Sequence, residues 1–184
     1  MNGQTKIDDL RAETRGERKK RRNRQALVAA AYAVMAKKGI DAATMAEIAD
    51  LADVGAGTMY NYFDSKDELA VAVLELVMDR LAQRIEAVMK PRLQTIAEKT
   101  GVIGDIRGRG AMIAVEIVKP GTDEPDAALT GAIAKACHAQ GVVVLTAGTY
   151  GNVLRFLPPL VIPDHLLDEA LTVIEEQFLA QTGH

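Results

Sequence analysis

Side chains able to hold a polyanion are concentrated in the segment VGAGTMYNYFDSKDEL, residues 54–69. Hydroxyl groups donate hydrogen bonds to phosphate oxygens, and short polar side chains reach base edges in a DNA groove. A short helix here can present Thr58, Tyr60, Asn61 and Tyr62 outward. Its apolar residues can face a core, namely Val54, Met59 and Phe63. The alternative is that the tyrosines themselves belong to that core.

The flanking sequence predicts the helices that would position these residues. Apolar residues at helical spacing predict a helix from Asn23 to Lys38, with a face of Leu27, Ala30, Ala31, Val34 and Met35. Thr44 with Glu47 forms the pattern of a capping box that starts a second, short helix. Gly55 and Gly57 permit a sharp turn or a close backbone approach after it. A longer helix is expected from Ser65 to just before Pro91. Two short helices joined by a tight turn indicate a helix-turn-helix motif.

A basic run precedes this motif. Residues 14–24, TRGERKKRRNR, hold seven basic residues and one acidic residue, although the chain has a net charge of −3. Such a run suggests a polyanionic partner, and it adds Arg22 and Arg24 to the expected DNA contacts. Lys66, in the first turn of the long helix, would meet a flanking phosphate. The alternative for the run is a solvated arm without a partner.

The segment TMAEIADLADVGAGTMYNYFDSKDEL resembles the DNA-binding domain of the TetR family of transcriptional repressors over about residues 20–80. The resemblance implies that Thr44, Thr58, Tyr60 and Lys66 anchor phosphates. It also implies that Ala56, Gly57, Asn61 and Tyr62 read or skirt bases. The chain departs from the family where Gly55 and Ala56 follow the valine, because relatives often carry a polar residue there. Ala56 could offer only methyl contact to thymine.

The second half predicts a different architecture. GAMIAVEIV, residues 110–118, reads as a buried strand, and VVVLT and NVLRFLPP read as two more. Helices are expected from an Asp126 cap to Gly141 and over PDHLLDEALTVIEEQFLA. The predicted fold class is therefore mixed: an all-α helix-turn-helix domain followed by a small α+β domain with a short antiparallel sheet.

This half is similar to the C-terminal small domain of class III aminotransferases from about residue 90 to the end. The resemblance places Arg155 where such enzymes bind a substrate carboxylate, and a guanidinium fork suits a carboxylate. The alternative for Arg155 is a structural ion pair. Those enzymes use pyridoxal phosphate, which needs a Schiff-base lysine, an acid at the pyridine nitrogen and a phosphate cradle. No lysine here has a matching context, so we expect no catalytic residues, no cofactor and no enzyme activity.

Composition excludes other classes of protein. No apolar run approaches the roughly 20 residues of a membrane span, and residues 1–10 lack the apolar stretch of a secretory signal. One cysteine, Cys137, fits a reducing cytoplasm, and we expect it in a core. One Cys and three His are too few for a typical zinc site. GDIRGRGAM is glycine-rich but precedes a strand, which argues against a phosphate loop.

The sequence thus predicts a basic flexible arm at 1–22, a helix-turn-helix domain at 23–90 and an aminotransferase-like domain at 91–184. The expected function is a cytoplasmic, sequence-specific transcriptional regulator, a repressor, that binds double-stranded DNA as a homodimer. Its C-terminal domain would serve dimerisation or sensing, with a small carboxylate such as 4-aminobutyrate or glutamate as effector. Two alternatives remain: a non-functional fusion carrying an incomplete 4-aminobutyrate aminotransferase fragment, and a chain that assembles with separate transaminase subunits.

Overall fold

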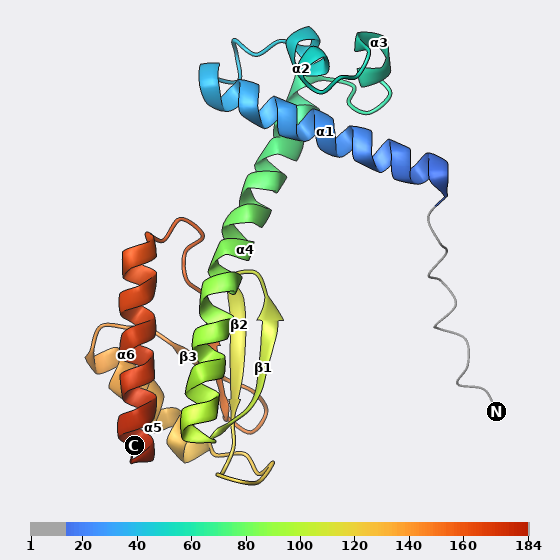
Figure 1. The fold of residues 1–184 in the computed structure, drawn as a ribbon. Coiled ribbons are helices and arrows are strands. Elements are labelled where there is room, and N and C mark those ends of the chain that lie inside the picture. The colour runs from blue at the N-terminus through green and yellow to red at the C-terminus, as the bar shows by residue number, and fades with distance from the viewer. Residues whose placement is uncertain (1–13, 184) are drawn as a thin grey trace, which may run out of the picture. The chain divides into compact units, whose positions relative to one another are not determined.

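The chain forms two compact units. The computed structural model describes residues 14–183 (Figure 1). Contacts divide the chain into Met1–Val77 and Met78–His184. The sequence analysis placed this boundary after residue 90, whereas the contacts place it after Val77, inside the long helix α4, Lys66–Thr100. No helix among residues 14–183 is long and apolar enough to cross a membrane.

The N-terminal unit is helical. It comprises α1 (Arg15–Lys38), α2 (Met45–Leu51), α3 (Ala56–Met59) and the start of α4. The predicted apolar face of α1 is buried in one core with Ile48, Phe63 and Leu69. This confirms the expected inward face of the first helix.

The expected arm at 1–22 is in part helical, because α1 begins at Arg15. Thr14 and Glu17 form a reciprocal capping box: the Glu17 amide donates to the Thr14 hydroxyl at 3.2 Å, and the Thr14 amide donates to the Glu17 carboxylate at 2.7 Å. The hydrogen bond from the Thr14 amide to the carboxylate is the main cause that lowers the pKa of Glu17. This cap starts the helix eight residues earlier than the apolar pattern predicts. The rest of the arm, residues 1–13, lies outside the described residues.

The expected end of the long helix before Pro91 is wrong, since α4 continues to Thr100. An interior proline removes one helical hydrogen bond and typically costs about 3 kcal/mol. Met89, Leu93 and Ile96 on both sides of Pro91 are buried in the C-terminal core. Their burial, at roughly 1.5–3 kcal/mol per large apolar side chain, offsets that cost.

The C-terminal unit holds a four-stranded antiparallel sheet in the order β1-β2-β4-β3. Its strands are β1 (Ile103–Arg109), β2 (Met112–Ile117), β3 (Leu145–Ala147) and β4 (Val153–Phe156). This confirms the predicted antiparallel α+β layer and the strands β2 and β4. The predicted strand at 142–146 overlaps β3 only at Leu145 and Thr146. Strand β1 is not predicted from the sequence. Its glycines and charged residues lack the apolar alternation of a strand, and its residues show little burial.

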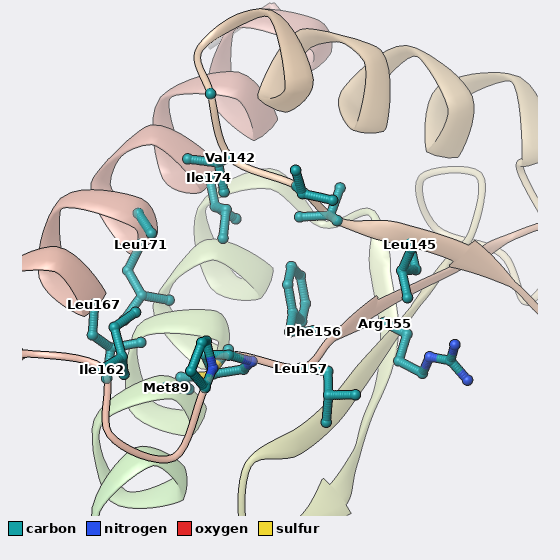
Figure 2. Close-up of a pocket in the computed structure, with 16 residues that line it drawn as sticks. Met89, Val142, Leu145, Arg155, Phe156, Leu157, Ile162, Leu167, Leu171 and Ile174 are labelled. Atoms are coloured by element: carbon teal, nitrogen blue, oxygen red, sulfur yellow. The ribbon is translucent and has the colours of Figure 1, made fainter.

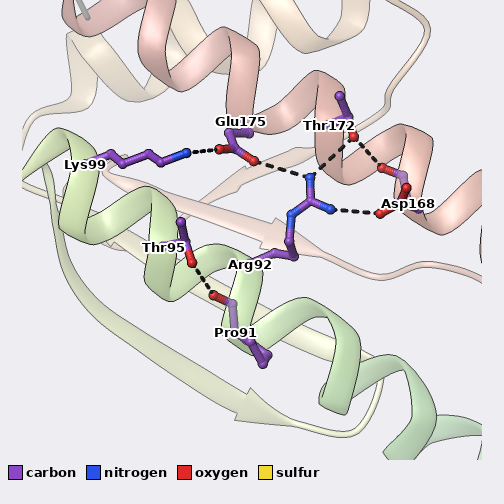
Figure 3. Close-up of polar contacts among 7 residues, drawn as sticks. All are labelled: Pro91, Arg92, Thr95, Lys99, Asp168, Thr172 and Glu175. Atoms are coloured by element: carbon purple, nitrogen blue, oxygen red, sulfur yellow. Dashed lines mark hydrogen bonds and ion pairs between the residues drawn. The ribbon is translucent and has the colours of Figure 1, made fainter.

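Helices cover one face of this sheet. α5 (Ala127–Ala139) begins at an Asp126 cap, as predicted, and α6 (Asp164–Thr182) closes the chain. Side chains of α4, α5 and α6 share one buried core with those of β2 and β4. A polar network joins α4 to α6 on the surface, centred on Arg92 and Glu175 (Figure 3).

Candidate DNA-binding and carboxylate sites

The turn between α2 and α3 depends on Asp53. Its φ is +54°, and it is the single non-glycine residue with positive φ among residues 14–183. Aspartate tolerates this left-handed conformation better than most residues. The amide of Val54 then donates to the carbonyl of Ala49 at 3.0 Å and closes the turn. Neither Gly55 nor Gly57 has a positive φ, so the left-handed backbone of the turn comes from Asp53 and the expected role of these glycines in close backbone approach stays a prediction.

Helix α3 is short, Ala56–Met59, and apolar side chains attach it to the N-terminal core. Val54, Met59 and Phe63 are all buried, which confirms their predicted inward orientation. Apolar burial is therefore what fixes this short helix, since four residues cannot form a stable helix alone.

The outer surface of α3 and the following turn is exposed. Ala56, Gly57, Thr58 and Asn61 are exposed, and Tyr60 retains 56% of its surface. A Cβ added at Gly57 would meet nothing within 4 Å. The glycine is thus not required by the fold, and its bare backbone leaves room for a groove wall to approach.

Thr44 is exposed and caps α2. Its hydroxyl accepts a hydrogen bond from the Glu47 amide at 3.3 Å. The reciprocal half of the predicted capping box is not formed, because the Glu47 carboxylate pairs with Lys38. Thr44 therefore keeps its hydroxyl proton for another acceptor.

Two expected DNA contacts are bonded within the fold. Tyr62 is half-buried, and its hydroxyl accepts a hydrogen bond from Asn23 Nδ2 at 3.2 Å. The Lys66 ammonium donates to the carbonyls of Asp41 at 3.0 Å and Ala43 at 3.4 Å. The expectation that Tyr62 projects freely outward is wrong, because its ring packs on the core. Each side chain still has one donor hydrogen left.

Arg22 and Arg24 lie exposed on α1. The Arg24 guanidinium carbon is 5.0 Å from the centroid of the Phe63 ring, a cation–π distance. This contact ties the basic end of α1 to the segment after α3. Asn23, which sequence reasoning missed, makes a second such tie through Tyr62. The sequence offers no signal for Asn23, since the contact joins residues 39 positions apart.

Arg155 lies exposed on β4 and borders a cavity of about 490 Å³ in the C-terminal unit. The cavity is lined mainly by apolar side chains, with Phe156, Leu167, Leu171 and Ile174 among them (Figure 2). The guanidinium extends away from Phe156 and from the α6 side chains (Figure 2). Successive side chains of a strand point to opposite faces, so Arg155 and its neighbour Phe156 point to opposite faces of the sheet although both line the cavity.

Other polar groups of this unit are structural. Cys137 is fully buried as expected, and desolvation raises the pKa of its thiol to about 11. The His138 ring lies 2.8 Å from the carbonyl of Val144. Within residues 14–183 the structure contains no group of three or more Cys, His, Asp or Glu that could hold a metal ion.

Two families match the chain. The model of the class-III aminotransferases matches residues 57–178, and that of the bacterial regulatory proteins of the tetR family matches residues 27–73. The two overlap at 57–73. Phe63, Leu69 and Val73 from this overlap are buried in the N-terminal core, so the overlap belongs physically to the helix-turn-helix unit.

Curated relatives match the second half. The chain is 55% identical over 93 residues to 4-aminobutyrate aminotransferase of Mycobacterium tuberculosis, covering 50% of this chain and 21% of that protein. It is 44% identical over 113 residues to 5-aminovalerate aminotransferase DavT of Pseudomonas putida, covering 59% of this chain and 27% of that protein. The chain thus spans about a fifth to a quarter of the length of these relatives.

Solved structures of related enzymes are similar to the chain in fold. An Arthrobacter phospholyase in complex with phosphoethanolamine matches with a TM-score of 0.50 and 27% identity, covering 73% of this chain and 29% of that one. A Bacillus anthracis aminotransferase matches with a TM-score of 0.52 and 23% identity, covering 73% and 28%, and supports the fold alone. The chain belongs to the class-III aminotransferase family, and its residues 27–73 match the model of the bacterial regulatory proteins of the tetR family.

Proposed function

We propose that this chain is a sequence-specific transcriptional regulator, a repressor, that binds double-stranded DNA as a homodimer. The observation that carries the proposal is the exposed surface of α3, Ala56–Met59, and the turn after it, held on buried Met59 and Phe63. In a helix-turn-helix the second helix enters the major groove. The match to the tetR regulatory family over residues 27–73 supports the same role.

The proposed contacts divide into two kinds. Thr44, Thr58 and Tyr60 expose hydroxyls suited to phosphate oxygens, and Arg22 and Arg24 add charge. Ala56, Gly57 and Asn61 are exposed where base edges would lie. The remaining donor hydrogens of Tyr62 and Lys66 can serve phosphates without breaking their internal bonds. Specificity would then rest on Asn61 and on methyl contact from Ala56.

The C-terminal unit is proposed to be non-catalytic. Pyridoxal phosphate chemistry needs a lysine and an acid at one site, and the cavity of about 490 Å³ is lined by neither. Among the described lysines of this unit, Lys90, Lys99 and Lys119 pair with carboxylates. Lys135 is exposed on α5. These residues do not fit the cofactor.

A sensing role would use Arg155. It forms no hydrogen bond or ion pair with another residue of the described chain, so its guanidinium is available to a carboxylate. Isothermal titration with 4-aminobutyrate and with glutamate tests this role. Heat that is lost in Arg155→Met would support it, and no heat with either acid would remove it.

The regulator itself is tested by fluorescence anisotropy with the DNA upstream of the chain's own gene. We expect submicromolar binding that survives excess random DNA, weakens with salt and is lost in Tyr60→Ala. Glu98→Ala, an exposed site in the C-terminal unit, is the matched control and should bind like the parent. Weak binding that is equal on random DNA would contradict the proposal.

The alternative is a fusion without a DNA target. It is favoured by exposed apolar residues in the C-terminal unit, including Val143 and Val161, since such residues mark a surface whose partner is elsewhere. Limited proteolysis distinguishes the two. Rapid cleavage throughout 101–183, with 14–77 protected, would favour the fusion, whereas a protected C-terminal unit would favour the regulator.

A further inference from the structure

The two faces of the sheet differ in burial. One face is covered by helices, and its residues Ile113, Val115, Leu154 and Phe156 are buried. By strand alternation the opposite face carries Met112, which is 53% exposed, Leu145, which is 42% exposed, and Leu157, which follows β4 and is 60% exposed. At the edges of the sheet these residues also border cavities that α4 and α6 help to line. We call this surface the open sheet face: it comprises these three residues with Asp105, Arg107, Ala114, Glu116 and Arg155. Clustered exposed apolar residues on a sheet mark an interaction surface.

The register fixes where the charges of the open sheet face lie. Arg107 on β1 pairs with Ala114 on β2, and Ala114 pairs with Arg155 on β4. Asp105 pairs with Glu116 in the neighbouring row. The carboxylate Asp105 and the guanidinium Arg155 therefore stand on the two strands that flank β2.

Only part of this charge is neutralised within the chain. Arg107 donates to Asp105 Oδ2 and to Glu116 Oε2, each at 2.7 Å. The hydrogen bond from Arg107, followed by one from Asn152, lowers the pKa of Glu116, which is therefore ionised at neutral pH. Asp105 Oδ1 accepts no hydrogen bond from the residues described, and Arg155 likewise has no partner there. An acceptor oxygen and a guanidinium thus remain free on the same face.

We propose that the open sheet face is the homodimer interface, and that its occupant is a second copy of this chain. A two-fold axis passing over β2 lays Arg155 of each copy on Asp105 of the other, which forms two equivalent ion pairs. Met112, Leu145 and Leu157 then lie around these pairs. An isologous contact requires such self-complementarity, because one patch must satisfy itself. This inference rests on the proposed regulator function, because the interface would bring together the two copies that this function needs.

The size of the face sets the expected affinity. Four strands span about 19 Å across, and the individual strands run about 10–24 Å. The area is at the low end of protein interfaces, so we expect a dissociation constant in the micromolar range. Two half-sites on one DNA would raise the local concentration of the second copy and strengthen the contact.

Sedimentation velocity of the full chain over about 1–100 µM tests the interface in the absence of DNA. We expect the parent to shift from monomer to dimer across this range. Arg155→Asp and Asp105→Arg should each weaken dimerisation at least tenfold, because like charges then face one another. Lys135→Asp makes the same charge change at an exposed residue of α5, a helix on the side of the sheet that the helices cover. This variant should dimerise like the parent.

Mixing the two single variants is the decisive measurement. In the heterodimer of Arg155→Asp with Asp105→Arg, both pairs are complementary again, so an equimolar mixture should dimerise although each variant alone does not. Circular dichroism confirms that each variant is folded. A parent that stays monomeric to 100 µM, an Arg155→Asp variant that dimerises normally, or a mixture that stays monomeric would each overturn the proposal.

Anisotropy on DNA separates this inference from the regulator. A monomer that binds a half-site specifically would overturn the interface and leave the DNA-binding function standing. A dimer with the expected charge dependence but no preference for any DNA would overturn the DNA-binding function and leave the interface standing.

Discussion

Arg92 on α4 reaches two carboxylates on α6, Glu175 at 3.2 Å and Asp168 at 2.8 Å (Figure 3). Lys99, two turns further along α4, donates to the other oxygen of Glu175 at 2.6 Å. Glu175 thus sits between two cations and is the least exposed member of this network, with 19% of its side-chain surface accessible. The hydrogen bond from Lys99, followed by the contribution of Arg92, lowers the pKa of Glu175.

This relationship predicts a pH-dependent stability. A carboxyl group with a pKa lower in the folded state stabilises the fold above its unfolded pKa, and that contribution is lost as pH falls through the folded value. Glu175→Gln should therefore reduce the free energy of unfolding by about 0.5–1 kcal/mol at pH 7, a small value because solvent screens the pair. At pH 3 the difference from the parent should shrink. Urea unfolding at both pH values measures it, and a difference that is constant with pH would contradict the role of the charge.

The left-handed backbone at Asp53 predicts the outcome of two substitutions. Asp53→Gly should keep or slightly raise the stability of the N-terminal unit, since glycine adopts φ of +54° without strain. Asp53→Val should lower it by about 1–2 kcal/mol, because a β-branched residue is strained there. Thermal unfolding followed by circular dichroism compares the two. Equal losses in both variants would mean that the carboxylate matters instead of the backbone.

The buried thiol of Cys137 reports on the integrity of the C-terminal unit. A thiol with a pKa of about 11 is almost entirely protonated at pH 8, and the thiolate is the reactive form. We expect the folded chain to react with iodoacetamide at least a hundredfold slower than the chain unfolded in urea. Fast labelling under native conditions would show that this unit opens readily, as the fusion alternative implies.

The exposed cations of α1 should contribute charge without sequence preference. Arg22→Ala should weaken binding to specific and random DNA by a similar factor, and should reduce the salt slope of log Kobs by about 1. Arg24→Ala should do the same and also lower the stability of the N-terminal unit by about 0.5–1 kcal/mol, because it loses the contact with Phe63. Salt titrations by anisotropy and urea unfolding separate the two effects.

A carboxylate ligand and the second copy would compete for Arg155. If both proposals hold, millimolar 4-aminobutyrate or glutamate should raise the dimer dissociation constant in sedimentation experiments. An equal concentration of chloride controls for ionic strength. A dissociation constant that is unchanged by the acid would leave Arg155 with at most one of these roles.

The amino-acid sequence by itself determined the parts that depend on local patterns. Periodicity identified the buried face of α1, the inward Val54, Met59 and Phe63, the strand β2 and the Asp126 cap of α5. These features follow from neighbours within one or two turns or from strand alternation, so they are readable along the chain.

Only the tertiary structure decided the features that depend on distant residues. α4 runs through Pro91 because burial on both sides offsets the lost hydrogen bond. β1 forms because β2 supplies its hydrogen bonds, although its own residues show little burial. Tyr62 and Lys66 bond to residues 39 and up to 25 positions away, and Arg155 borders the apolar cavity with its guanidinium directed away from Phe156. Such contacts join segments that are remote along the chain, and no local pattern encodes them.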